Sequence, residues 1–255
     1  MTVSQTAEFL AQTGNGIHQR ICASQVRGDV VEATEMLMAR LVQSGNTLRV
    51  LCDHTKSHDW TWDGASILRT SYDAMLQALY IFHDDAKRDG LARRFLDFRV
   101  VEQMKLLRVV DEYSPRFSRW LSARPLRATN EPEIKKQYAI VCQKYGFPEK
   151  KPPNNWHGLG LGALAKKCGY EAECQFLQKY LSAIVHSSVF GISGSGPMPE
   201  NLVQYQWTFA YRVLDKIAAY ARIEPSATEK ELFDFFRQNI FDRGQFPTTG
   251  LQEQE

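Results

Sequence analysis

The chain has 255 residues, of which 44% are hydrophobic and 24% are charged. This length and composition allow one large hydrophobic core or two smaller ones. The formal net charge is only +2, so the total charge indicates no particular class of partner. No apolar run approaches the roughly 20 residues of a membrane-spanning helix. Five scattered cysteines, and an N-terminus (MTVSQTAEFL) without a basic start or an apolar core, predict a reduced, cytoplasmic protein.

The spacing of apolar residues is helical along most of the chain. From Asp29 onward, leucines and valines recur at steps near 3 and 4, which predicts a long first helix. A second helix is expected from about Asp63, a residue type that caps helix N-termini well, to His83. Further helices are predicted over residues 91–113, 131–145, 163–167, 171–186, 201–221 and 228–240.

Prolines, glycines and asparagines interrupt these helices, and no segment shows the alternation of a strand. Thr228 and Glu231 have the spacing of a capping box at the start of the last helix. The predicted fold is all-α, an irregular multi-helix bundle with long loops near residues 55–62, 146–160 and 187–200. We expect a single helical domain over residues 1–242 and a polar, frayed tail over residues 243–255.

Charge is distributed unevenly along the chain. Residues 87–127 contain eleven Lys and Arg against five Asp and Glu, and residues 135–167 contain seven against one. The segments toward both ends are acidic. This asymmetry fits either a surface for an anionic ligand or acidic ends that fold onto a basic middle. Four arginines in the irregular part of the first basic run are the predicted ligand-binding residues: Arg116, Arg119, Arg124 and Arg127.

Two polar groupings lie beside apolar helix faces. Arg69 and Asp73 are four residues apart on the second predicted helix, as in a partly buried ion pair or the wall of a cleft. Ser182 and His186 belong to a polar stripe on the helix that ends at His186. A histidine there complements the helix dipole, but the long Gly/Ser-rich segment that follows also fits a gated cleft. We therefore expect Arg69, Asp73 and His186 to converge, with His186 as general acid/base and Ser182 as a ligand contact.

Two other motifs are weaker. His54 and His58 share a helix face and could ligate zinc, but four contiguous polar residues are more typical of a solvated helix end. Gly158, Gly160 and Gly162 precede a helix, yet a dinucleotide-binding loop needs a strand where KPPNN stands. No metal or cofactor is expected.

Four segments occur in a recognisable order: SILRTSYDAMLQALYI, ARRFLDFRVVEQMKLL, NNWHGLGLGALAKKCG and YLSAIVHSSVFG. Over residues 48–191 the chain resembles a family of bacterial helical proteins catalogued only as a domain of unknown function. The resemblance implies an all-helical fold and no established activity. It singles out Arg69, Asp73, Arg94, Phe95, Trp156, Ser182 and His186. HEPN-type ribonucleases are a fold-level analogy alone, since no arginine lies four to six residues before His186.

The sequence therefore leads to two functional hypotheses. The first is a helical protein whose polar cleft handles RNA or another phosphate-rich ligand, as an effector of a stress or defence system. The second is a non-enzymatic interaction module that forms a homo-oligomer or joins a larger assembly. Trp156 is expected to anchor the PPNNWHG loop by burying its indole ring.

Overall fold

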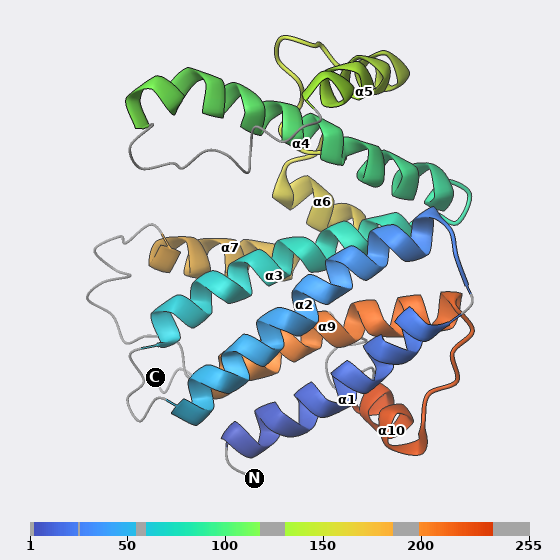
Figure 1. Ribbon diagram of the computed structural model, residues 1–255. Helices are drawn as coiled ribbons and strands as arrows, with labels where there is room; N and C mark the ends of the chain where they lie inside the picture. Colours follow the sequence, from blue (N-terminus) through green and yellow to red (C-terminus); the bar gives the residue numbers. More distant parts are fainter. Residues whose placement is uncertain (1–2, 25, 55–59, 118–130, 186–198, 237–255) are drawn as a thin grey trace. The chain divides into compact units, whose positions relative to one another are not determined.

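The computed structural model describes residues 3–24, 26–54, 60–117, 131–185 and 199–236. Every regular element in these ranges is an α-helix, which confirms the all-α prediction (Figure 1). None of the described helices is both long and apolar enough to cross a membrane. The helices are α1 (Val3–Ala23), α2 (Asp29–His54), α3 (Thr61–Phe82), α4 (Arg88–Phe117), α5 (Glu131–Tyr145), α6 (Leu161–Lys167), α7 (Glu171–Val185), α9 (Pro199–Tyr220) and α10 (Ala227–Phe236).

The chain divides into two compact units. Unit 1 comprises Met1–Arg88 and Gly160–Glu255, and unit 2 comprises Asp89–Leu159. The extent of a single domain over residues 1–242 stays a prediction. The expected tail over residues 243–255 lies outside the described residues.

Unit 1 is built around α9. In sequence order α1 packs on α2 and α2 on α3, and α9 packs against all three of these helices (Figure 1). All residues from 206 to 214 of this helix are buried, which is typical of a helix surrounded by others. Trp207, Phe209 and Tyr211 of α9 are fully buried. On the other side of α3, α6 and α7 complete the unit, and α10 packs against α9.

Unit 2 consists of the long helix α4, the helix α5 and the irregular segment of residues 146–159. The segment carries no helix, as the prolines predicted. Side chains of α4 hold it: Lys105 Nζ donates a hydrogen bond to the Pro153 carbonyl at 2.5 Å, and Arg108 Nη2 donates to the Glu149 carbonyl at 2.9 Å. Trp156 is 2% exposed and meets Phe95 edge to face at 5.6 Å between ring centroids. The predicted burial of this indole is confirmed.

Three local predictions are corrected. The apolar spacing placed the first helix at Asp29, but α1 precedes it. The second predicted helix begins at Thr61 and not at Asp63, which lies in its first turn. The capping box of α10 uses Ser226 and Glu229, two residues before the predicted pair: the Ser226 amide donates to Glu229 Oε2 at 2.7 Å, and the Glu229 amide donates to Ser226 Oγ at 3.4 Å.

Candidate functional site between α3, α7 and α9

Arg69 and Asp73 lie on α3, and both are half-buried. Asp73 Oδ2 accepts a hydrogen bond from Gln77 Nε2 at 2.9 Å, one turn further along the same helix. Among the ion pairs of the described residues, none joins Arg69 to Asp73. Burial raises the pKa of the Cys174 thiol on α7, and the positive charge of Arg69 opposes that shift, so Arg69 lies close to α7.

The other predicted site residues fall largely outside the description. His186, Arg119, Arg124 and Arg127 lie outside the described residues, and so do the side chains of Ser182 on α7 and Arg116 on α4. The structure does bring α3 and α7 together, as the predicted network requires. The convergence of Arg69, Asp73 and His186 stays a prediction.

A buried ion pair joins α7 to α9. Arg212 Nη1 of α9 donates a hydrogen bond to Glu173 Oε1 of α7 at 2.8 Å, and the side chains are 5% and 11% exposed. The guanidinium also lies over the ring of Tyr170, 4.4 Å from its centroid. A charge is costly to bury unless a partner and further contacts compensate for its lost hydration. Glu173 and Tyr170 supply that compensation for Arg212.

Tyr72 links α3 to the same group of residues. Its hydroxyl donates a hydrogen bond to the Tyr170 carbonyl at 3.4 Å, and its ring packs on Phe209 at 5.2 Å between centroids. Burial, with the nearby Glu173 carboxylate, raises the pKa of Tyr72 far above its ordinary value. Tyr72 is therefore a neutral phenol, and it acts here as a hydrogen-bond donor rather than as a base.

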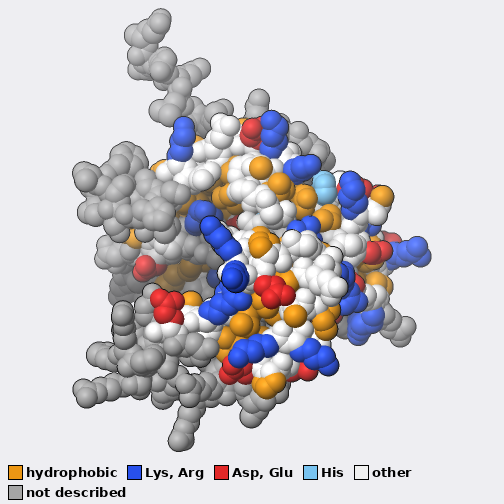
Figure 2. Space-filling model, turned by 90° about the horizontal axis from the view of Figure 1, so that it is seen from above, with side chains coloured by type: hydrophobic (Ala, Val, Ile, Leu, Met, Phe, Trp, Pro, Cys, Tyr) orange, Lys and Arg blue, Asp and Glu red, His pale blue; other side chains and the backbone are white. Residues whose placement is uncertain are grey.

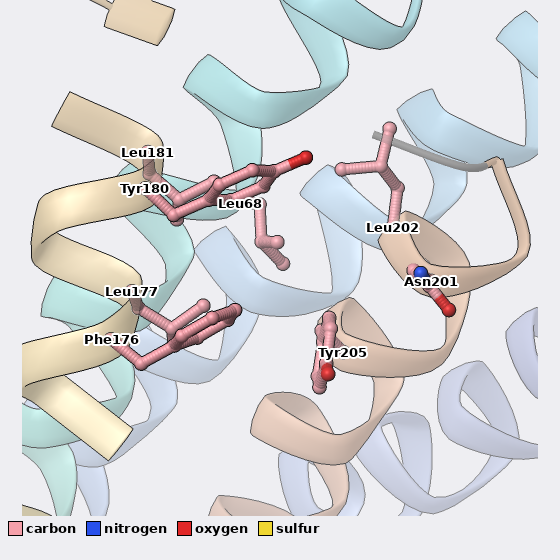
Figure 3. Close-up of a pocket in the computed structure, with 8 residues that line it drawn as sticks. All are labelled: Leu68, Phe176, Leu177, Tyr180, Leu181, Asn201, Leu202 and Tyr205. Atoms are coloured by element: carbon pink, nitrogen blue, oxygen red, sulfur yellow. The ribbon is translucent and has the colours of Figure 1, made fainter. Parts of the chain in front are cut away.

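A cavity of about 240 Å³ is lined by residues of the same three helices, α3, α7 and α9 (Figure 3). Phe176 and Tyr180 extend from α7 toward α9, whose residues form the opposite wall, and Leu68 comes from α3. The lining residues are Leu68, Phe176, Leu177, Tyr180, Leu181, Asn201, Leu202 and Tyr205. Burial, followed by the effect of Glu173, raises the pKa of Tyr205 to about 12, so its hydroxyl carries a proton at neutral pH.

Cys22 and His18 of α1 lie close together, but they do not have the ionisation of a catalytic pair. Cys22 Sγ lies 3.5 Å from His18 Nε2, and Glu35 interacts with both groups. A nucleophilic cysteine needs a lowered pKa. Burial and Glu35 instead raise the pKa of Cys22 to about 11, and burial lowers the pKa of His18. The thiol and the imidazole are therefore both neutral at pH 7.

Metal binding is not indicated within the described part of the chain, which contains no group of three or more His, Cys, Asp or Glu residues that could hold an ion. The His54 side chain and all of His58 lie outside that part. The predicted alternative of a zinc site at these two histidines stays untested.

The Arg212–Glu173 pair and the cavity were not foreseen from the sequence. The sequence does contain a signal for the ion pair. Arg212 is the single cation within the apolar stretch WTFAYRVL, and a cation in such a stretch predicts a buried partner of opposite charge. The cavity has no comparable signal. Its lining consists of ordinary core leucines and aromatic residues whose spacing is that of any packed helix.

Comparison with known proteins agrees with the resemblance seen in the motifs. No curated protein and no solved structure matches the chain. The analogy with HEPN ribonucleases receives no support. A family model described as "Family of unknown function (DUF5677)" matches residues 33–196, which include α3, α7 and the polar contacts between them. This match covers more than half of the chain, and the protein therefore belongs to the DUF5677 family of unknown function.

Proposed function

We propose that this protein binds RNA or a similar phosphate-rich polymer through unit 2. The observation that carries the proposal is a separation of charge between the units. Residues 89–159 contain fourteen Lys and Arg against eight Asp and Glu, a net charge of +6, whereas the rest of the chain has a net charge of −4. Cations that contact phosphates release counterions, which favours binding irrespective of base sequence.

Part of this positive charge is engaged within unit 2. Arg94 lies over the rings of Tyr145 and Phe147, and Lys144 pairs with Asp97 at 2.8 Å. Phe98, which could have stacked on an unpaired base, is 3% exposed. The side chains left for a polyanion are exposed ones on α4, on α5 and in the segment after α5, among them Arg99, Lys136, Lys150 and Lys151.

The distribution of charge on the surface favours loose, sequence-independent contact. On the face shown in Figure 2, Lys and Arg side chains are spread among hydrophobic and other side chains, and Asp and Glu side chains lie between them. A polyanion would meet several separate cations rather than one dense patch. Such contacts depend strongly on ionic strength because they are electrostatic and exposed.

The test is RNA retention in gel-shift titrations at several salt concentrations. Lys136→Glu, Lys150→Glu and Lys151→Glu together should weaken binding of a single-stranded RNA and lower the log–log salt slope by about 2, at about 0.7 for each lost contact. The matched control reverses three exposed lysines of unit 1, Lys179, Lys216 and Lys230, and changes the net charge equally. Equal losses in both variants, or no retention of RNA by the wild type at low salt, would refute the proposal.

Catalysis is a separate question within this proposal. His186 remains the candidate general acid/base, with Asp73 orienting Arg69 or His186. His186→Ala should leave RNA retention intact and abolish any cleavage. A general acid/base lowers the activation barrier of the reaction and does not contribute to binding of the RNA phosphate backbone. Arg116, Arg119, Arg124 and Arg127 remain predicted ligand contacts, and their replacement by Glu should weaken binding as the lysine variant does.

The second candidate function is an interaction module, as a homo-oligomer or a subunit of a larger assembly. Leu106 and Val109 of α4 are 46% and 50% exposed and stand three residues apart, hence on one helix face. Leu106→Glu with Val109→Glu should shift the protein to a smaller species in size-exclusion chromatography with light scattering. Met36→Glu, at a 45% exposed position on α2, is the control. A wild-type protein that is monomeric at high concentration would exclude the homo-oligomer.

A further inference from the structure

The cavity between α3, α7 and α9 has a definite size. A cavity of about 150 Å³ is known to accommodate benzene, and pockets for drug-sized ligands start at about 300 Å³. At about 240 Å³, this cavity lies between the two. An occupant with one or two rings would match this volume, whereas a whole nucleotide would exceed it.

The lining determines the chemistry of that occupant. None of the eight lining residues in the described part of the chain carries a charge, which disfavours an ionised ligand. The rings of Phe176 and Tyr180 are stacked, with centroids 5.8 Å apart and planes 11° apart, and both residues line the α7 side of the cavity. Flat aromatic surfaces pack favourably with other aromatic rings.

Two of the lining residues have polar side chains that could orient an occupant. Asn201 and Tyr205 stand on the α9 wall, opposite the aromatic side chains of α7 (Figure 3). The Tyr205 hydroxyl is protonated at neutral pH, and the Asn201 amide can both donate and accept. A small set of polar groups in an otherwise apolar pocket is typical of sites that bind small molecules.

We infer that this cavity is a binding site for a neutral aromatic compound of one or two rings that carries a hydrogen-bonding group. The inference is independent of RNA binding, since it rests on residues of unit 1 alone.

The test compares two probes of equal size, benzamide and benzoate, by calorimetry and by saturation-transfer NMR in the absence of RNA. Benzamide should bind, and benzoate should bind at least about tenfold more weakly because its carboxylate would be desolvated. Indole, with two fused rings and one donor, should bind at least as well as benzamide.

Two variants locate the binding. Phe176→Ala should weaken benzamide binding about fivefold by removing the flat wall, and it should fold normally because Phe176 is 52% exposed. Tyr205→Phe should weaken binding about fivefold by removing the hydroxyl alone. Phe9→Ala, at a 39% exposed phenylalanine of α1, is the matched control and should bind like the wild type.

Three outcomes would overturn the inference: no binding of benzamide or indole at millimolar concentration, equal binding of benzamide and benzoate, or the same loss in Phe176→Ala as in Phe9→Ala. If Tyr205→Phe fails to fold, the comparison of Phe176→Ala with Phe9→Ala still decides whether benzamide binds in this cavity. Loss of RNA retention with intact benzamide binding would refute only the proposed function, and the reverse result would refute only this site.

Discussion

Asn15 of α1 and Asn46 of α2 exchange a pair of hydrogen bonds, because each Nδ2 donates to the other's Oδ1 at 3.2 Å. A glycine precedes each asparagine, and both glycines, Gly14 and Gly45, lie against the fully buried indole of Trp207. A Cβ added at Gly45 would lie 2.5 Å from Trp207 Cζ2, closer than real Cβ atoms approach any neighbour. Two Gly-Asn pairs thus hold one tryptophan of α9 between α1 and α2.

Gly45→Ala should therefore destabilise the protein, although alanine is the better helix former by about 1 kcal/mol. Overpacking against a rigid indole costs about 1–3 kcal/mol, which exceeds that gain. Urea denaturation measures the change. The control is Gly162→Ala in α6, where a Cβ meets nothing within 4 Å, and its stability should stay the same or rise. A Gly45→Ala protein as stable as the wild type would show that Trp207 can move away.

Glu173→Gln should lower the free energy of unfolding by about 3–5 kcal/mol, because it leaves the buried guanidinium of Arg212 without its counter-charge. Glu171→Gln, two residues earlier on the same helix, is the control. Glu171 is half exposed and lies 3.9 Å from Lys166, and exposed pairs of this kind contribute at most about 1 kcal/mol. Similar effects of the two substitutions in thermal unfolding would contradict the role given to the buried pair.

Acid should weaken the attachment of α10 through Glu229. Burial raises the pKa of this carboxyl, but hydrogen bonds from Arg20 and Ser226 outweigh burial and hold the pKa below its ordinary value of 4.5. Its stabilising contribution is therefore present above pH 4.5 and is lost as the pH falls through the lower pKa of the folded state. Glu229→Gln should flatten the decline of stability over this acidic range, measured by urea denaturation at a series of pH values. An unchanged pH profile in the variant would argue against the linkage.

Trp156→Ala should cost about 3–5 kcal/mol, since the indole is almost fully buried and packs against Phe95. Thermal denaturation followed by circular dichroism measures the loss. Asn154→Ala, at an exposed position of the same segment, should change stability by no more than about 0.5 kcal/mol. A Trp156→Ala protein that melts at the wild-type temperature would show that the segment does not depend on this anchor.

Most helices could be predicted because their apolar residues repeat with the period of a helix, and the fold class followed from that. Helix α1 could not. Its TGNG stretch contains two glycines, and each lowers helix propensity by about 1 kcal/mol relative to alanine. In the folded protein Gly14 lies against Trp207 of α9, nearly two hundred residues away in the chain, and the spacing of residues within one segment carries no record of such a contact.

The candidate site was predicted less completely, for two physical reasons. The i,i+4 rule places Asp73 beside both Arg69 and Gln77, and it cannot decide which of them the carboxylate contacts. Counting charges cannot separate cations that face water from those that satisfy backbone carbonyls. Arg108 and Lys105 belong to the second kind, since the irregular segment after α5 presents carbonyls that need donors.

The insertion of unit 2 between α3 and α6 has a consequence for how the chain folds. Contacts of α3 with α6 and α7 form only after the chain closes a loop of about 80 residues. The entropy of loop closure rises by about 0.6 kcal/mol for each doubling of length, so a linker of about nine residues would lower that cost by about 2 kcal/mol. The helices α1, α2 and α3 close much shorter loops, so contacts among these consecutive helices form at a smaller entropic cost than contacts of α3 with α6 and α7.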